Sequence, residues 1–317
     1  MKISVVIPTV DRTDPLRRAV SNCISQLDPS DSAEIVVVDN SPDGRQRWVI
    51  DEILAKPANS HPLPVRLIHE PRRGLAHARN SGIAEARGEF VVFLDDDEEP
   101  QQGWLRAIVE ALEQTGADAA FGAVIPVFAA PPRRLADVAI RLYTRLLSVN
   151  NLQDISPHFN LLGTGNSCFR AATCFAGEDE PFDPRFNQTG GEDTDFLRRL
   201  YLKGRTLVWA ADAVVQEFVP ADRLTPAYMG ARRFMQGQMR SFSHMASIPK
   251  RPDKTAFWML AGAAQYAGHA LAAALNAIAG RDEQADAHRI QAQGGLGKVL
   301  WQARFRRVRY GAPEAGA

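Results

Sequence analysis

Residues 90–100 read FVVFLDDDEEP, an apolar run that ends in five consecutive carboxylates. A short, uninterrupted apolar run is typical of a strand buried on both faces, as in a parallel sheet. Ligands of open α/β sheets bind beyond the carboxyl ends of such strands, so the run predicts a site at residues 95–99. Five neighbouring negative charges need cations or hydrogen bonds to offset their repulsion, and oxygen ligands suit Mg²⁺ or Mn²⁺ held together with a phosphorylated substrate. A solvent-exposed acidic loop is the alternative.

The first 220 residues alternate between strand-like and helix-like patterns, which predicts an α/β fold. We expect strands at 3–7, 35–38, 65–69, 90–94, 118–128 and 161–170, and helices at 16–27, 75–87, 104–113 and 190–204. The loop after the first strand, PTVDRTDP, has neither a G-x-G-x-x-G fingerprint nor a Walker glycine-lysine loop. This argues against a classical NAD enzyme and a P-loop NTPase.

Composition restricts the partners and the compartment. Lys plus Arg equals Asp plus Glu at 37 each, so no overall charge favours nucleic acid, and we expect no nucleic-acid partner. The three cysteines show neither metal-ligand nor disulfide spacing, which suits a reducing compartment. The N-terminal MKISVVIP lacks the features of a secretory signal, so we expect a cytoplasmic protein.

A second acidic cluster, GGEDTDF, begins the predicted helix 190–204. The apolar stripe of this helix consists of Phe196, Leu197 and Leu200. Asp193 precedes these residues by helical spacings and is expected on the same inward face, although a helix-start carboxylate without a catalytic role is the alternative. Asp195 stands four residues before Arg199, which predicts a helix-surface ion pair. Glu192 is expected to stabilise the helix N-terminus electrostatically.

Basic and glycine residues between these clusters are further candidates. Arg73 precedes the predicted helix 75–87, where a guanidinium favours an anion such as diphosphate, while Arg79 within the helix fits that role and a solvated charge equally well. Gly163 and Gly165 indicate close approach of the backbone to a ligand or a neighbouring strand. Residues 141–145 are interpreted either as an acceptor groove or as a surface helix.

In order, the segments SVVIPTVDR, VVVDNS, RGLAHARNSGI, FVVFLDDDEEP and GGEDTDF resemble the family 2 glycosyltransferases. The resemblance covers about the first 220 residues and implies the GT-A fold, a Rossmann-like nucleotide-binding mixed sheet flanked by helices. It implies a catalytic domain at 1–220, with a nucleotide-sugar half at 1–115 and an acceptor half at 116–220. A C-terminal helical region would then occupy 221–317.

The resemblance also implies roles for individual residues. Those expected at the nucleotide or the donor are Pro8, Thr9, Asp11, Arg12, Asp39 (at the base), Arg73, Asp95 and Asp96. Asp97 is expected to bind Mn²⁺ or Mg²⁺, with Asp95 as a second candidate ligand, and Asp193 to be the catalytic base. Further contacts to the acceptor or the donor sugar are expected from Gly165, Asn166, Gly191 and Glu192.

The implied activity is inverting transfer of one sugar from a nucleotide-diphosphate sugar, with UDP the commonest donor nucleotide. The implied acceptor is a saccharide or a lipid-linked saccharide in surface polysaccharide or glycan biosynthesis. Processive members carry a Q-x-x-R-W element, whereas residues 236–241 read QGQMRS, so we expect a non-processive enzyme. A sugar-nucleotide nucleotidyltransferase and a catalytically inactive nucleotide-sugar-binding module are the alternatives.

The last hundred residues lie outside the resemblance. Residues 225–245 predict a helix, and 255–280 carry no charged residue. The second stretch is long enough to span a bilayer, but it is dominated by alanine and interrupted by polar residues, which favours a buried or interfacial helix. The segment 296–310, LGKVLWQARFRRVRY, predicts a basic helix on the cytoplasmic face of an anionic membrane, or else a solvated helix or a dimer contact.

Overall fold

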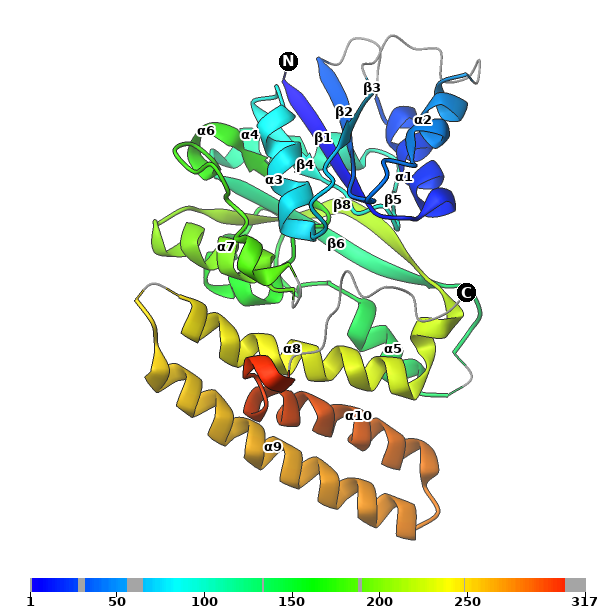
Figure 1. Ribbon diagram of the computed structural model, residues 1–317, viewed down its shortest axis with the longest axis vertical. Helices are drawn as coiled ribbons and strands as arrows, with labels where there is room; N and C mark the ends of the chain where they lie inside the picture. Colours follow the sequence, from blue (N-terminus) through cyan, green and yellow to red (C-terminus); the bar gives the residue numbers. More distant parts are fainter. Residues whose placement is uncertain are drawn as a thin grey trace. The chain divides into compact units, whose positions relative to one another are not determined.

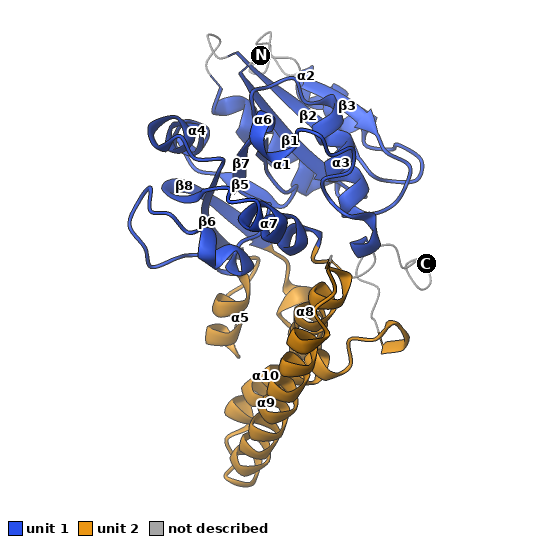
Figure 2. Ribbon diagram, turned by 90° about the vertical axis from the view of Figure 1, so that its left-hand side faces the viewer, with its two compact units in different colours: residues 1–127, 144–187, 192–218 blue, residues 128–143, 188–191, 219–317 orange. Residues whose placement is uncertain are grey.

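The structure is a computed structural model that describes residues 2–27, 32–55, 65–132, 134–187, 190–247 and 249–305 (Figure 1). The chain divides into two compact units (Figure 2). Unit 1 comprises residues 1–127, 144–187 and 192–218, and unit 2 comprises residues 128–143, 188–191 and 219–317. The main boundary lies next to the expected division at residue 220, but two short segments expected in the catalytic domain belong to unit 2.

Within the described residues, a mixed eight-stranded sheet has the order β3-β2-β1-β4-β7-β6-β8-β5. Its strands are β1 (Ile3–Thr9), β2 (Ala33–Asp39), β3 (Val65–His69), β4 (Phe90–Phe93), β5 (Glu98–Pro100), β6 (Ala119–Phe128), β7 (Ser167–Arg170) and β8 (Leu207–Val219). The first four strands run parallel, whereas β7 is antiparallel to β4 and β6, and β5 to β8. The expected fold class is confirmed.

Helices cover both faces of this sheet because side chains alternate along each buried strand. Val5 and Ile7 pack with α1 (Thr13–Ser25), α2 (Arg47–Leu54) and α4 (Trp104–Thr115). Val6 packs on the opposite face with α3 (Leu75–Glu85), α6 (Ala171–Cys174) and α7 (Glu192–Leu202). The three cysteines are buried and free.

Two regions of unit 1 differ from the expectation. The strand expected at 161–170 is confined to β7, because a 3-10 helix occupies Ser156–Leu161 and a loop with Asn166 at φ +49° follows it. Strands β5 and β8 were not expected. A further short 3-10 helix lies at Pro184–Phe186.

Unit 2 contains α5 (Ala136–Tyr143), a 3-10 turn (Ala221–Leu224), and the long helices α8 (Pro226–Ala246), α9 (Pro252–Ile278) and α10 (Asp282–Val299). Helix α10 lies between α8 and α9 (Figure 1). Glycines let the helices approach closely: a Cβ at Gly262 would lie 2.6 Å from the carbonyl oxygen of Gly295. Among the described helices, none is long and apolar enough to cross a membrane.

The basic helix expected at 296–310 is not present as such. Helix α10 ends at Val299, and only a 3-10 turn at Ala303–Phe305 follows within the described residues. Lys298 is turned inward, where its Nζ donates to Gln265 Oε1 at 2.6 Å. Arg304 is described, whereas Arg306, Arg307 and Arg309 lie outside the described residues.

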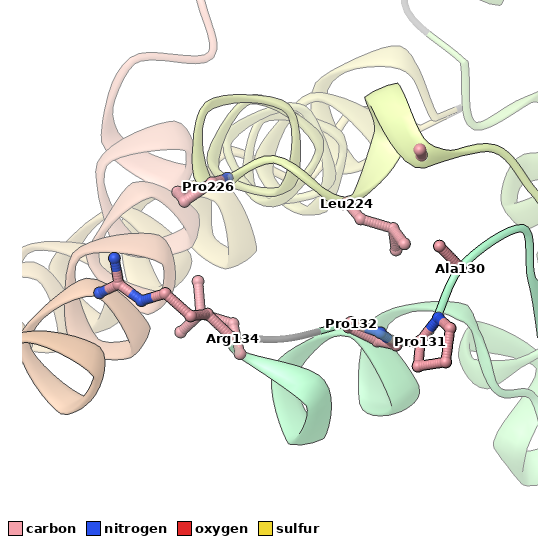
Figure 3. Close-up of a pocket in the computed structure, with 8 residues that line it drawn as sticks. Ala130, Pro131, Pro132, Arg134, Leu224 and Pro226 are labelled. Atoms are coloured by element: carbon pink, nitrogen blue, oxygen red, sulfur yellow. The ribbon is translucent and has the colours of Figure 1, made fainter.

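A pocket of about 380 Å³ lies within unit 2, between the segments 130–135 and 221–226 (Figure 3). Among the described residues its lining is mainly Ala, Pro and Leu, and the guanidinium of Arg134 in this lining is paired with Asp286 at 3.0 Å. None of the expected site residues lines it.

Candidate active site

The acidic loop follows β4 and contacts the loop that follows β1. Asp96 is buried and accepts hydrogen bonds from Thr9 Oγ1 (2.7 Å) and Arg12 Nη1 (2.8 Å). The same Arg12 nitrogen donates to Asp97 Oδ2 at 2.9 Å. Two segments that are 84 residues apart therefore meet at the carboxyl ends of neighbouring parallel strands, as expected for a ligand site.

The structure also explains how five adjacent carboxylates are accommodated. Glu99 pairs with Arg18 at 2.6 Å, and Glu98 accepts a hydrogen bond from the backbone N–H of Asp95 at 3.0 Å. Burial, followed by the nearby Asp95, raises the pKa of Glu98 well above its usual range, and burial raises the pKa of Asp96 to about 6. Burial therefore favours the neutral form of Glu98 more than it would for an exposed glutamate. The alternative of a solvent-exposed acidic loop is wrong.

A buried arginine joins this loop to the second acidic cluster. The Arg79 side chain is only 3% exposed, and its Nη1 pairs with Glu192 Oε1 at 2.6 Å. Its Nη2 lies 3.5 Å from Asp95 Oδ1. Arg79 is therefore not a solvated helix charge, and Glu192 pairs with it rather than serving only its own helix end. The pair connects residues 113 positions apart, a link that sequence spacing could not reveal.

Asp193 lies in the first turn of α7 and is partly exposed. Its Oδ1 accepts a hydrogen bond from the backbone N–H of Thr194 at 2.6 Å. A Cβ at Gly163 would lie 3.3 Å from Asp193 Oδ2 and 2.8 Å from Arg145 Nη1, so these two side chains approach the same glycine. Arg145 also donates to the carbonyl oxygen of Gly165. The expected apolar stripe of α7 is buried.

Asp195 forms the expected ion pair with Arg199, at 3.0 Å. Its side chain is buried, however, and also accepts from Arg198 at 3.1 Å, while Arg199 pairs with Glu178 at 2.5 Å. The expectation of a surface pair is therefore wrong. Asp195 belongs to a partly buried charge network that fixes α7.

Asp39, at the end of β2, is completely buried. Its carboxylate accepts hydrogen bonds from the Ser41 backbone N–H (2.9 Å) and hydroxyl (2.5 Å) and from the Gln46 backbone N–H (2.8 Å). These bonds shape the loop after β2. Recognition of a base by Asp39 stays a prediction.

Asp11, in the loop after β1, lies near two arginines from other loops. Arg73 precedes α3, and Arg45 follows β2. Asp11 has φ +52°, and its Oδ2 accepts from Arg73 Nη2 at 3.2 Å while Arg45 Nε lies 3.8 Å from Oδ1. Pro8 is buried in β1 opposite Val38 and contributes to packing.

Gly165 and Asn166, two residues expected to contact a sugar, have different surroundings in the structure. A Cβ at Gly165 would lie 2.7 Å from Asp95 Oδ2, so a side chain of the acidic loop comes close to this glycine, and its contact with a sugar stays a prediction. Asn166 is completely buried; its amide donates to the carbonyl oxygens of Ala123 and Ala213 (both 2.8 Å), and its Oδ1 accepts from Trp104 Nε1 (2.7 Å). A sugar contact by the Asn166 side chain is therefore not supported.

Gly191 is another residue expected to contact the acceptor or the donor sugar. It has φ +94°, and a Cβ added there would collide with the Met239 side chain. Its positive φ and its packing against α8 account for glycine at this position, and its contact with a sugar stays a prediction.

The carboxylate oxygens of Asp95 and Asp97 fit a divalent cation that completes its coordination shell with oxygens of a bound substrate and water. No group of three or more His, Cys, Asp or Glu residues in the described chain could hold a metal by itself. Mg²⁺ in proteins often binds one or two carboxylates and completes its shell with phosphate oxygens and water. The partly exposed carboxylates of Asp97 and Asp95 suit that mode.

The fold and the two connected acidic clusters can now be compared with known proteins. A family model described as glycosyl transferase family 2 matches residues 4–183. This chain belongs to that family. One relative, the succinoglycan biosynthesis protein ExoM of Rhizobium meliloti, is 27% identical to this chain over 209 residues. That alignment covers 64% of this chain and 62% of ExoM, so the chain matches less than two thirds of that relative's length.

Solved structures support the GT-A fold of this family 2 glycosyltransferase. The Staphylococcus aureus TarS 1–349 complex with UDP is 16% identical, with a TM-score of 0.55 and coverage of 93% of this chain and 90% of TarS. The mannosyltransferase PcManGT of Pyrobaculum calidifontis, in complex with GDP-Man and Mn²⁺, is 22% identical, with a TM-score of 0.56 and coverage of 92% and 86%. At these identities the likeness establishes the fold alone.

Proposed function

We propose that the protein transfers one sugar, with inversion, from a nucleotide-diphosphate sugar to a saccharide or lipid-linked saccharide in surface polysaccharide biosynthesis. Membership of the family supports the transfer reaction. The relation to a succinoglycan biosynthesis protein supports the pathway class. The acceptor class rests on the resemblance of the motifs to the family.

One observation carries this proposal: Arg79 connects the two acidic clusters. Its pairs with Glu192 at 2.6 Å and with Asp95 at 3.5 Å hold the start of α7 beside the end of β4. A displacement with inversion needs a base separate from the groups that bind the leaving diphosphate. This arrangement supplies a second set of carboxylates next to the first, on a separate element.

The residues are assigned the following roles. Asp193, partly exposed beside Gly163, accepts the proton of the attacking hydroxyl. Asp97, with Asp95, holds Mn²⁺ or Mg²⁺, which when bound neutralises negative charge on the diphosphate. Holding donor and acceptor together removes much of the entropic cost of a two-substrate reaction.

The donor side is assigned to the loops after β1 and β2. Arg12, which pairs with Asp96, and Arg73, which pairs with Asp11 in the loop after β1, are assigned to the donor. Thr9 and Asp96, which share a hydrogen bond, are assigned to the same side. Asp39 and Asp11 are assigned to the nucleoside. UDP is the first nucleotide to test, although the two structural neighbours were solved with different nucleotides, UDP and GDP-Man.

Thermal stability with UDP, GDP, dTDP or CMP, each with and without Mn²⁺, identifies the donor nucleotide. A ligand at 100 times its Kd adds about 2.7 kcal/mol of stability, so the cognate nucleotide raises the Tm visibly when Mn²⁺ is present. The matching nucleotide sugar is then assayed for hydrolysis or transfer. Binding without turnover identifies an inactive module, and formation of a nucleotide sugar from a nucleoside triphosphate and a sugar phosphate identifies a nucleotidyltransferase.

A peripheral contact with the cytoplasmic face of the membrane is also part of the proposal. It rests on the basic segment with Arg304, Arg306, Arg307 and Arg309, only the first of which is described. Replacing all four by Gln should weaken binding to anionic vesicles by roughly 1 kcal/mol per residue. A wild-type protein that ignores such vesicles at low salt would remove this part of the proposal.

A further inference from the structure

Helix α9 has an unusual distribution of polar and apolar side chains. On the side of the helix near Lys298, Trp258 is partly buried. Besides Tyr266, five large apolar residues are exposed, Leu260 to 74% and Ile278 to 86%, and they are Phe257, Leu260, Leu271, Leu275 and Ile278. They recur at spacings of three, four and seven residues or their sums, so they form one stripe along the helix.

The opposite side of α9, which packs on α10, carries the polar groups. Gln265 Nε2 donates to the carbonyl oxygen of Gln291 at 3.3 Å, and Gln265 Oε1 accepts from Lys298. His269 Nδ1 lies 3.0 Å from His288 Nδ1. Gln265 and His269 therefore face into the unit while the five apolar residues of the stripe face outward, the reverse of what water favours. An apolar stripe of this kind indicates a protein or membrane contact.

The sequence of the stripe is nearly the same when followed from either end. Large residues lie at both ends, and Ala267 and Gly268 at the centre are small, while the exposed Leu271 is as far from the centre on one side as Ala264 is on the other. The midpoint between Phe257 and Ile278 falls between Ala267 and Gly268. A two-fold symmetric contact requires a surface that is complementary to itself, and small central residues let two helices approach closely.

We propose that the outer face of α9 is a homodimer interface in which two copies of α9 pack antiparallel, with the two-fold axis near Ala267 and Gly268. Phe257 of one copy then lies near Ile278 of the other, and Leu260 near Leu275. This inference concerns assembly and does not depend on the identity of the sugar donor.

A membrane surface fits the same face less well. Helices that lie in a membrane interface carry Lys and Arg on the polar face bordering the apolar one. No residue from Thr255 to Gly280 is charged, and the polar groups of α9 contact α10 instead. The small centre of the stripe also offers little apolar area to lipid.

The first experiment measures the mass of the full chain in solution by light scattering, over about 1 to 100 µM. A contact along one helix pair is smaller than a standard protein interface, so we expect dissociation on the order of micromolar. Leu260→Glu combined with Leu275→Glu should make the protein monomeric across this range, because each Glu would be buried in the contact. Gln284→Glu, on an exposed position of α10, is the matched control and should remain dimeric.

Cysteine cross-linking tests the antiparallel arrangement. The three native cysteines are buried, so an added surface cysteine reports alone. Ala267→Cys should form a disulfide-linked dimer under mild oxidation. Leu260→Cys should not, because in an antiparallel pair its two copies are about 22 Å apart, whereas a disulfide joins Cα atoms within about 7 Å.

Three results would overturn the proposal. One is a monomer at every concentration, and another is a dimer that the double Glu variant leaves intact. The third is efficient cross-linking through Leu260→Cys, which would indicate a parallel pair. A monomeric wild type that binds vesicles of phosphatidylglycerol and phosphatidylethanolamine, and loses that binding in the double Glu variant, would assign the face to the membrane instead.

Discussion

The acidic loop in unit 1 and the outer face of α9 in unit 2 both place side chains where their chemistry is disfavoured. In the loop, carboxylates such as Asp96 and Glu98 are buried, whereas on α9 apolar residues such as Leu260 and Ile278 are exposed. The loop offsets its cost within the chain, through Arg12, paired hydrogen bonds and the raised pKa of Glu98. In the described chain, nothing covers the α9 stripe. The compensated carboxylates lie at the carboxyl end of a parallel strand, where α/β sheets bind ligands, whereas the exposed apolar stripe indicates a partner surface.

The largest expected effect is on the rate of transfer, and it distinguishes the partly exposed Asp193 from the buried Asp195, both in α7. Asp193→Asn removes the assigned proton acceptor and nearly preserves its shape, so transfer should fall by roughly 10² to 10⁴ while nucleotide binding persists. Initial rates with the cognate donor, together with nucleotide affinity, measure this.

Asp195→Asn is the control for that variant. Asp195 is buried against Arg198 and Arg199, so its loss should lower the Tm while folded molecules keep most of their activity. Equal losses of transfer at both positions, or full transfer by Asp193→Asn, would show that the base is another group.

The next largest effect is on the free energy of unfolding, and it tests whether the buried pair of Arg79 with Glu192 stabilises the fold. Arg79→Met would leave Glu192 buried without its cation, and breaking a buried pair in this way costs about 3–5 kcal/mol of unfolding free energy. Urea denaturation gives this value. Arg106→Met, which removes an exposed pair with Glu110, is the matched control and should leave the urea midpoint unchanged. A wild-type midpoint for Arg79→Met would show that the link contributes little.

A smaller effect is expected at the assigned metal ligand. Asp97→Asn should weaken Mn²⁺-dependent nucleotide binding on the order of tenfold or more, and leave the Tm without ligand nearly unchanged because the residue lies in a loop. Titration calorimetry with and without Mn²⁺ measures the difference. Asp51→Asn, on the exposed side of α2, should bind as the wild type does. Unchanged affinity in Asp97→Asn would contradict its role as a ligand.

The smallest effect concerns the polar side of α9. Burial, and then the neighbouring His288, lower the pKa of His269 below its ordinary value of 6.5. The folded protein therefore binds fewer protons than the unfolded chain, so stability is full above about pH 6.5 and decreases as the pH falls below that value. His269→Gln should reduce this slope in urea midpoints measured between about pH 7.5 and pH 5.5.

His158→Gln, at an exposed position in unit 1, is the control for the pH experiment and should keep the wild-type slope. If His269→Gln has the same slope as the wild type, then the histidine pair is not a source of the pH dependence.

The sequence by itself determined the type and order of most elements in unit 1, although not, for example, of α2, β5 and β8, and it predicted a site at the end of β4. Apolar runs and their periodicity report which residues share a buried strand or helix face, so β3 has the expected bounds and the stripe of α7 is buried as expected. The family was also evident, because its motifs are short local segments in a fixed order.

Only the tertiary structure decided the partner of Arg79, the burial of Asp195 and Asn166, and the direction of the α9 stripe. Each depends on contacts between residues far apart in the sequence, such as the 113 positions between Arg79 and Glu192. Periodicity identifies the faces of a helix but not which face another element covers. For α9, α10 contacts the polar face, so the same pattern that suggested a buried or interfacial helix produces an exposed apolar surface.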